Sequence, residues 1–405
     1  MYKAVIPCVV IANHCFQCRL AAAVQKSIKI TAWPLSKENL IMQKSLVTQT
    51  MVTDPPQEEC TVWILAPDSN ETGHYVMHKT RDWGDGEEIS VNLFFSRYSQ
   101  GKYKVLAFSP YMLFNEKGLG LVDTSAPKTT DDAPDLKCLT IGTTMNRVVH
   151  NCANVQEALE MLDGFTKDGV TNPRHENYML CDAHDAVIVE LSPRHIACRH
   201  VANGFAVHTN HHIFQEMLHL SQGKLEGVIK SATRMVITQD ALAKSFQEHG
   251  KITLEDTLTL SRLQDKENYP DTCPFRNSSV CALDYIPNGD YPGLLGTLRI
   301  CPGPPRYTIA IPVSLGITDI PEVLRNGDFG KRSYEIKRKY LDDDTILVKF
   351  QEMEQRFWKN YLETIAQAKE LIVQNQLETF HTMVQNLLDK QVAEAYALLE
   401  TLVND

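Results

Sequence analysis

The chain has 405 residues, of which 43% are hydrophobic and 22% are charged, enough apolar material for one large domain or two smaller ones. Its formal net charge of −10, carried without a basic block, argues against a nucleic-acid partner, because phosphates demand clustered lysine and arginine. No apolar stretch approaches the roughly 20 residues needed to cross a bilayer, so we expect no membrane partner. The 11 cysteines lack framework spacing, which favours a reducing compartment and therefore a cytoplasmic protein.

Residues 1–59 form a poorly patterned leader that contains the breaker Asp54-Pro55-Pro56. The apolar run near the start is interrupted by polar residues, so a secretory signal over residues 1–23 is the less favoured alternative. Cys15 and Cys18 form a CxxC pair, but no second pair with zinc-like spacing exists, and we expect no metal there.

From Cys60 to about Thr124, short β-prone runs alternate with turns, and residues 125–137 read as a polar loop. The β-prone runs cover residues 75–78, 90–95, 103–108 and 120–122. An apolar stripe at helical spacing follows at residues 155–162. Three further strands are predicted at residues 178–181, 186–191 and 205–209.

Residues 213–263 are mostly helical in pattern, and strand-like runs return at residues 279–285, 297–300 and 307–313. After Gly330 no glycine or proline occurs, and the apolar spacing predicts long amphipathic helices up to the end of the chain. This order of blocks predicts a layered arrangement of helices and largely antiparallel sheets.

Cys60 stands at the head of the apolar run Cys60-Thr61-Val62-Trp63-Ile64-Leu65. If the chain is cut between Glu59 and Cys60, one residue supplies a thiol nucleophile and, as its base, an α-amino group with a pKa near ~8. The plainer alternative is a small buried hydrophobic residue, which is what a lone cysteine opening a strand usually is.

Three further segments carry candidate polar groups. In Lys79-Thr80-Arg81-Asp82-Trp83, Asp82 can hold an α-ammonium or the thiol, and the two cations can favour a thiolate; the alternative is a solvent-facing turn. Asn115 and Asn210 can each offer an amide to a developing oxyanion, although Asn115 also suits a plain turn.

His208, His211 and His212 surround Asn210 in the sequence. They occupy alternate and adjacent positions with no acidic ligand beside them, so a structural role is favoured over a metal site. No GxSxG, HExxH, GxxxxGK[ST] or GxGxxG motif is present.

These segments, in this order, resemble the cysteine branch of the N-terminal-nucleophile hydrolases, and above all its group of penicillin-type acyltransferases, penicillin V acylases and bile-salt hydrolases. The resemblance spans roughly residues 60–315 and includes the stretch from Asn177 through Asp182, Glu190 and Pro193 to Asn210. Its motifs are Cys60-Thr61, Lys79-Thr80-Arg81-Asp82, Asn115-Glu116-Lys117-Gly118-Leu119, Thr209-Asn210 and the run 279–284.

The resemblance implies an α+β fold, the four-layer αββα sandwich of two antiparallel sheets, with a C-terminal helical extension. It implies Cys60 as nucleophile, Asp82 orienting the amine or thiol, and Asn115 and Asn210 around the oxyanion. Lys79, Arg81 and Trp83 are the expected substrate-binding residues. No metal and no cofactor are expected.

Three departures from the family pattern are visible. Thr80 replaces the usual asparagine, and the arginine that bile-salt hydrolases carry in the strand around residues 279–282 is absent, with Arg276 just upstream. Cys60 also follows a leader that ends in Glu58-Glu59, so activity requires removal of this leader. Attack of the Cys60 thiol on the Glu59 carbonyl would give an ester-like intermediate that water opens.

The expected function is therefore an autoprocessed amidohydrolase or acyltransferase that acts on a small linear amide through a thioester. The alternatives are a dipeptidase of the related cysteine clan and a binding protein of the same fold in which Cys60 is never exposed. We expect a leader over 1–59, a catalytic domain over 60–345, and helices over 346–405 that pack on this domain. A weaker alternative gives these helices a role in homo-oligomer formation.

Overall fold

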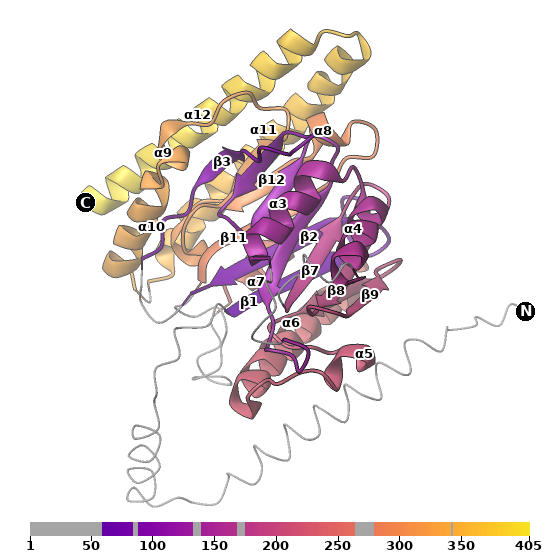
Figure 1. Cartoon of the computed structure of the whole chain (residues 1–405). Coiled ribbons are helices and arrows are strands. Elements are labelled where there is room, and N and C mark those ends of the chain that lie inside the picture. The colour runs from indigo at the N-terminus through magenta and orange to yellow at the C-terminus, as the bar shows by residue number, and fades with distance from the viewer. Residues whose placement is uncertain (1–58, 84–87, 133–138, 168–174, 264–278, 342) are drawn as a thin grey trace, which may run out of the picture. The chain divides into compact units, whose positions relative to one another are not determined.

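The computed structural model describes residues 59–83, 88–132, 139–167, 175–263, 279–341 and 343–405 (Figure 1). Several predictions lie outside these residues: the leader up to residue 58, the signal alternative over 1–23, the CxxC pair and Arg276.

The first of two sheets has six strands in the order β10-β1-β2-β11-β12-β13, and all neighbouring strands are antiparallel. Strands far apart in the chain are neighbours in this sheet, because β1 lies between β2 and β10. The bounds are β1 Glu59–Leu65, β2 Val76–Asp82, β10 Phe205–His208, β11 Ser279–Ile286, β12 Thr297–Cys301 and β13 Ile311–Ser314.

The second sheet has seven strands that follow one another in chain order, again all antiparallel. Its bounds are β3 Leu93–Ser96, β4 Val105–Phe108, β5 Met112–Asn115, β6 Gly120–Ser125, β7 Glu176–Cys181, β8 Ala186–Leu191 and β9 Ile196–His200. Antiparallel neighbours of this kind can be joined by short connections, but α3 (Ile141–Asn151) and α4 (Val155–Lys167) are inserted between β6 and β7.

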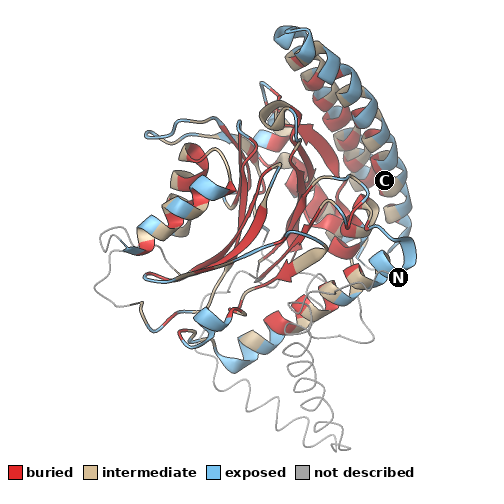
Figure 2. Cartoon of the chain, turned by 90° about the vertical axis from the view of Figure 1, so that its right-hand side faces the viewer, coloured by how far each residue is buried: buried red, intermediate tan, exposed pale blue. Residues whose placement is uncertain are grey.

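The two sheets pack face to face between layers of helices, as Figure 2 shows. Helices α3 and α4 cover the outer face of the seven-stranded sheet with one apolar cluster. Helices α6 (Leu225–His249) and α7 (Leu254–Ser261) pack on the outer face of the six-stranded sheet with another cluster. The predicted four-layer αββα sandwich is therefore confirmed.

Strand β1 contains an unbroken apolar run from Val62 to Leu65. Val62 and Ile64 point into the core between the sheets, whereas Trp63 and Leu65 pack against α6 and α7. Because side chains alternate between the two faces of a strand, a strand buried on both faces reads as an unbroken apolar run.

The C-terminal segment forms α10 (Asp328–Lys339) and two long helices, α11 (Thr345–Val373) and α12 (Leu377–Asn404). Phe350, Phe357 and Phe380 enter the same apolar cluster as the strands of the six-stranded sheet. Tyr361 Oη lies 2.9 Å from Thr297 Oγ1 in β12. The predicted terminal helices are thus present and pack against the sheet. Shorter elements are α5 Gln215–Leu218, α8 Pro292–Leu295, η1 Pro305–Tyr307 and α9 Glu322–Arg325.

Most predicted strands and helices match observed ones, with a few differences. Helix α3 and strands β5 and β9 were not predicted, and the strand expected over residues 307–313 consists of the end of η1 followed by β13. None of the helices within the described residues is both long and apolar enough to cross a membrane.

Candidate active site

The start of β1 lies opposite the end of β2. In the antiparallel register Glu59 is paired with Asp82 and Cys60 with Arg81. The Glu59–Cys60 peptide bond therefore faces the Arg81–Asp82 pair across the ladder. Cys60 itself is fully buried.

Asn210 contacts the backbone of Cys60. The Cys60 N–H donates to Asn210 Oδ1 at 2.7 Å. The other end of the same amide donates from Nδ2 to the carbonyl of Ser125 at 3.0 Å. A guanidinium nitrogen of Arg234, from α6, also donates to Asn210 Oδ1 at 2.7 Å. Asn210 thus turns its oxygen, not its NH₂ group, toward Cys60.

The residue before Asn210 anchors this position to both sheets and to α6. The carbonyl of Thr209 accepts hydrogen bonds from Thr124 Oγ1 at 2.9 Å and from Asn177 Nδ2 at 3.2 Å. The Thr209 hydroxyl lies 3.0 Å from the carbonyl of Ser231. Side chains held by several partners of this kind are positioned accurately, as a reacting group requires.

Asp82 is buried at the end of β2 and accepts a hydrogen bond from the Ser279 hydroxyl at 2.6 Å. Ser279 is its register partner on β11, just before an irregularity in the ladder between Ser279 and Cys281. A hydroxyl donor stabilises the ionised form of a carboxylate. The predicted alternative of a solvent-facing turn is wrong for this segment, because Lys79 to Asp82 form a buried strand.

Arg81 lies between two cysteines, because its register partners are Cys60 on β1 and Cys281 on β11. Its guanidinium donates to Ser109 Oγ at 2.7 Å and lies 5.0 Å from the Tyr111 ring centroid. The ring of Trp83 is 5.5 Å away. A buried cation lined by aromatic faces, next to Cys60, is suited to an anionic group.

Lys79 forms an ion pair between the two sheets. Its Nζ lies 2.6 Å from Asp123 Oδ1 in β6, and both side chains are buried. The ring of Tyr111 is 5.7 Å from the same nitrogen. Whatever its role toward a substrate, Lys79 joins β2 to β6.

Asn115 is not brought beside Cys60 by an observed contact. It ends β5 in the other sheet, and its two amide hydrogens are donated to the carbonyls of Val149 and Cys152 at 2.8 Å each. Its Oδ1 accepts from the backbone of Lys117 at 2.9 Å and of Leu119 at 3.0 Å. In this arrangement Asn115 closes the β5–β6 turn and ties it to the end of α3.

Two of the histidines around Asn210, His208 and His211, have side-chain hydrogen-bond partners. His208 Nε2 lies 2.9 Å from Glu190 Oε1, which also accepts from the backbone of Ile213 at 2.6 Å. Burial lowers the pKa of His211 to about 3 and that of His212 to about 4, so both are neutral near pH 7. Across the described part of the chain, no group of three or more metal-binding side chains is placed to hold an ion.

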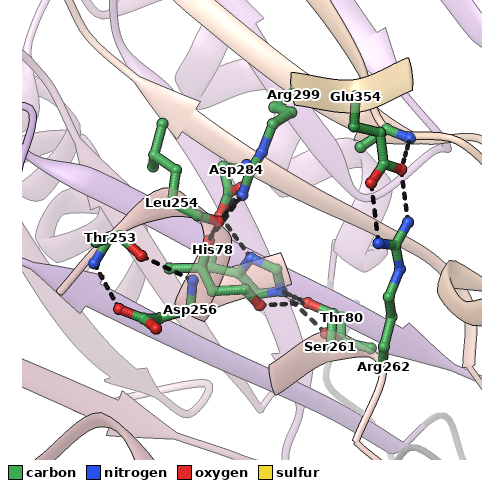
Figure 3. Close-up of polar contacts among 12 residues, drawn as sticks. His78, Thr80, Thr253, Leu254, Asp256, Ser261, Arg262, Asp284, Arg299 and Glu354 are labelled. Atoms are coloured by element: carbon green, nitrogen blue, oxygen red, sulfur yellow. Dashed lines mark hydrogen bonds and ion pairs between the residues drawn. The ribbon is translucent and has the colours of Figure 1, made fainter. Parts of the chain in front are cut away.

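A second polar cluster lies on the other face of β2 and resembles a serine triad (Figure 3). Ser261 Oγ lies 3.0 Å from His78 Nε2, and His78 Nδ1 lies 2.7 Å from Asp284 Oδ1. The Ser261 hydroxyl, however, donates to the carbonyl of Thr257 at 2.9 Å. Burial opposes ionisation of Asp284, but the charges of Arg299 and His78 outweigh it and lower the pKa to about 2.

All three members of this cluster are at most 2% exposed. A nucleophilic serine must give its proton to the histidine, whereas the Ser261 hydroxyl donates to the Thr257 carbonyl. We therefore assign the cluster to the packing of α7 on the sheet. A cavity of about 260 Å³ opens nearby and is lined by residues that include Arg299, Glu354 and Trp358, but not Cys60.

Arg234, Ser125 and Asp123 were not singled out from the sequence, and Ser279 was included only in the motif 279–284, without a role. One signal for Arg234 was available, because it falls on the buried stripe of α6 with Ser231, Met235 and Thr238. A charged residue on such a stripe needs a buried partner. Its partner, Asn210, is distant in the sequence and could not be read from the helix.

Comparison with solved structures finds similar chains, three of which share 12% to 17% sequence identity with this one. The penicillin V acylase of Agrobacterium tumefaciens is 17% identical with a TM-score of 0.40, and the match covers 63% of this chain and 86% of that chain. Two variants of the conjugated bile acid hydrolase of Clostridium perfringens are 12% and 13% identical, with TM-scores of 0.41 and 0.40. Each of these matches covers 63% of this chain and 92% of the hydrolase.

A comparison with curated protein sequences finds no match. The family model for acyl-coenzyme A:6-aminopenicillanic acid acyl-transferase, in contrast, matches residues 69–279, just over half of the 405-residue chain. This match confirms the resemblance seen in the motifs. The chain belongs to the acyl-coenzyme A:6-aminopenicillanic acid acyl-transferase family.

Proposed function

We propose that this protein is a cysteine N-terminal-nucleophile enzyme that is cut between Glu59 and Cys60 and then cleaves or forms small linear amides. Membership of the acyl-transferase family supports an enzyme of this class. The observation that carries the proposal is the contact of the Cys60 backbone nitrogen with Asn210 Oδ1 at 2.7 Å. The Asn210 side chain is fixed by Cys60, Ser125 and Arg234. A catalytic α-amino group needs a hydrogen-bond acceptor that is fixed in this way.

Processing comes first in this scheme. The Cys60 thiol adds to the Glu59 carbonyl carbon and its proton passes to a base. The C–N bond then breaks, the nitrogen takes a proton and becomes the α-amino group, and a thioester to Glu59 remains. Water opens the thioester and frees the thiol. Asp82 is the carboxylate paired with Glu59 in the ladder, and we assign it the role of base in this step.

Turnover then uses the free α-amino group as base. It takes the thiol proton while sulfur attacks the substrate carbonyl, and it returns this proton to the leaving amine. The product is a thioester on Cys60, which water resolves in hydrolysis and a second amine resolves in acyl transfer. Arg81, Lys79 and Trp83 would line the substrate side. The oxyanion roles predicted for Asn115 and Asn210 are left out of this scheme, because the NH₂ groups of both side chains are donated to backbone carbonyls.

Mass spectrometry of the purified full chain tests the first step. We expect a species that begins at Cys60 and that condenses with 2-cyanobenzothiazole, a reagent for an N-terminal cysteine. Cys60→Ala should remain one uncut chain. Cys281→Ala is the matched control, because it removes the other cysteine beside Arg81 and should leave processing intact.

Release of primary amine from a panel of penicillin V and N-acyl amino acids tests the second step. The processed wild type should release amine from at least one of them, and Cys60→Ala from none. A wild-type chain that stays uncut, or a Cys60→Ala chain that is equally active, would refute the proposal and favour a binding protein of this fold.

A further inference from the structure

Helix α6 brings a buried guanidinium to the group that contacts Cys60. Arg234 is only 2% exposed, and its Nη2 donates to Asn210 Oδ1 at 2.7 Å. The Cys60 nitrogen donates to the same oxygen, also at 2.7 Å. The two nitrogens are therefore separated by at most twice that distance.

Arg234 also decides which end of the Asn210 amide faces Cys60. A guanidinium can only donate hydrogen bonds, whereas an asparagine side chain has an accepting oxygen and a donating NH₂ group. If the amide were turned over, its NH₂ group would meet donors from both Arg234 and Cys60, and its oxygen would meet the Ser125 carbonyl. The observed orientation satisfies all three partners.

We propose that Arg234 is a positioning residue that holds Asn210 as the acceptor for the Cys60 α-amino group and keeps that amine neutral near pH 7. The inference rests on the proposed function, because it concerns the base that this function requires. An ammonium cannot take the thiol proton. A cation within this range disfavours a second positive charge and lowers the pKa of the amine by about two pH units at an effective dielectric constant of about 20.

The other charges near this site largely cancel or are absent near pH 7. Lys79 is paired with Asp123, and His208 contacts Glu190. Burial, His208 and Arg234 together lower the pKa of His211 to about 3, so it stays neutral. The following titratable or charged groups bear on the pKa of the Cys60 amine: Lys79, Arg81 and Asp82 from β2, Asp123 from β6, Glu190 from β8, His208, His211 and His212 from β10 and the following loop, Cys281 from β11, Tyr334 from α10 and Arg234.

Arg81 and Asp82 are adjacent and of opposite sign, so their effects on the amine oppose each other. Burial raises the pKa of Tyr334 to about 12, and it is uncharged. Among these groups Arg234 is the one that shares a hydrogen-bond acceptor with the Cys60 nitrogen. The charge of Arg234 should therefore have the largest effect on the pKa of the Cys60 α-amino group.

The test titrates the α-amino group itself. The protein is expressed as the full chain and allowed to process. It is then treated with methyl methanethiolsulfonate to cap the thiol and trace-labelled with acetic anhydride at a series of pH values. Mass spectrometry of the peptide beginning at Cys60 gives the extent of acetylation at each pH and so the midpoint of the α-amino titration. We expect Arg234→Met and Arg234→Gln to raise this midpoint by about two pH units and Arg234→Lys to raise it much less. Arg356→Met, which removes an exposed arginine on α11, is the control and should leave the midpoint unchanged.

The outcomes separate this inference from the proposed function. If the wild type never shows an N-terminal Cys60, both are wrong. If the wild type is processed and active but neither neutral variant moves the midpoint, the inference alone is wrong. Processing lost in both neutral variants but retained in Arg234→Lys supports a need for the charge. Processing lost equally in all three, with unchanged melting temperatures, contradicts it.

Discussion

The ion pair between Lys79 and Asp123 offers the clearest test of how the two sheets are joined. Both side chains are buried, and Nζ and Oδ1 are 2.6 Å apart. Lys79→Met leaves the Asp123 carboxylate buried beside an apolar side chain. Removing one partner of a buried pair costs about 3–5 kcal/mol, because the remaining charge loses its compensation. We expect the free energy of unfolding to fall by that amount.

The double variant distinguishes a lost charge partner from a lost contact. Replacing both members of a buried pair by apolar residues of similar size is often neutral or stabilising. Lys79→Met with Asp123→Leu should therefore recover most of the loss. Urea unfolding followed by circular dichroism measures both, with every chain also carrying Cys60→Ala so that all remain uncut.

An exposed ion pair serves as the matched control. On α4, Lys167 Nζ lies 2.5 Å from Asp163 Oδ2, and the lysine side chain is 71% exposed. Pairs of this kind contribute little, so Lys167→Met should leave the urea midpoint unchanged. The reasoning fails if Lys79→Met unfolds at the wild-type urea concentration, or if the double variant is no more stable than the single one.

Three further predictions concern the turn, the histidines and the substrate side. Asn115→Ala should lower the free energy of unfolding by about 2–4 kcal/mol in urea, because it leaves buried carbonyls without their donors; a wild-type midpoint would contradict this. The pKa values of His211 and His212 are lowered to about 3 and about 4, so below pH 6.5 the unfolded chain binds more protons than the folded one. Stability should therefore fall between pH 6.5 and pH 4 by up to about 1.4 kcal/mol per pH unit for each histidine, and His212→Phe should flatten the curve. Arg81→Met should lower kcat/KM for carboxylate-bearing amides at least about tenfold more than for neutral ones, through loss of a charge-assisted hydrogen bond; an equal loss for both would show that Arg81 does not select charge.

Much of the fold was readable because its strands are buried on both faces. The runs that became β1, β7, β8 and β11 are continuous and rich in β-branched or aromatic residues, and all were predicted. Helix α3 was missed because Ile141-Gly142-Thr143-Thr144 opens it with poor helix formers, which packing against β5 and β6 overrides. Strand β5 has only four residues, too few for a periodic pattern.

The candidate site was predictable only in its local parts. Cys60, Arg81 and Asp82 come together because β1 and β2 pair in one register, and Asn210 arrives because β10 is the other neighbour of β1. Neither pairing can be read from spacing. Asn115 shows the opposite case, since the Asn115-to-Leu119 motif fits a family site and a turn equally well. Two of its four side-chain hydrogen bonds close the turn, and the other two tie it to the end of α3.

Cutting the Glu59–Cys60 bond changes what the Cys60 nitrogen can do without moving its partner. As an amide it has one hydrogen, which Asn210 Oδ1 accepts, and no basic lone pair. As a neutral amine it has two hydrogens and a lone pair. Asn210 can keep its hydrogen bond while the lone pair faces the thiol of the same residue. An acceptor at this position therefore suits the chain both before and after processing, whereas a donor would compete with the thiol for the lone pair.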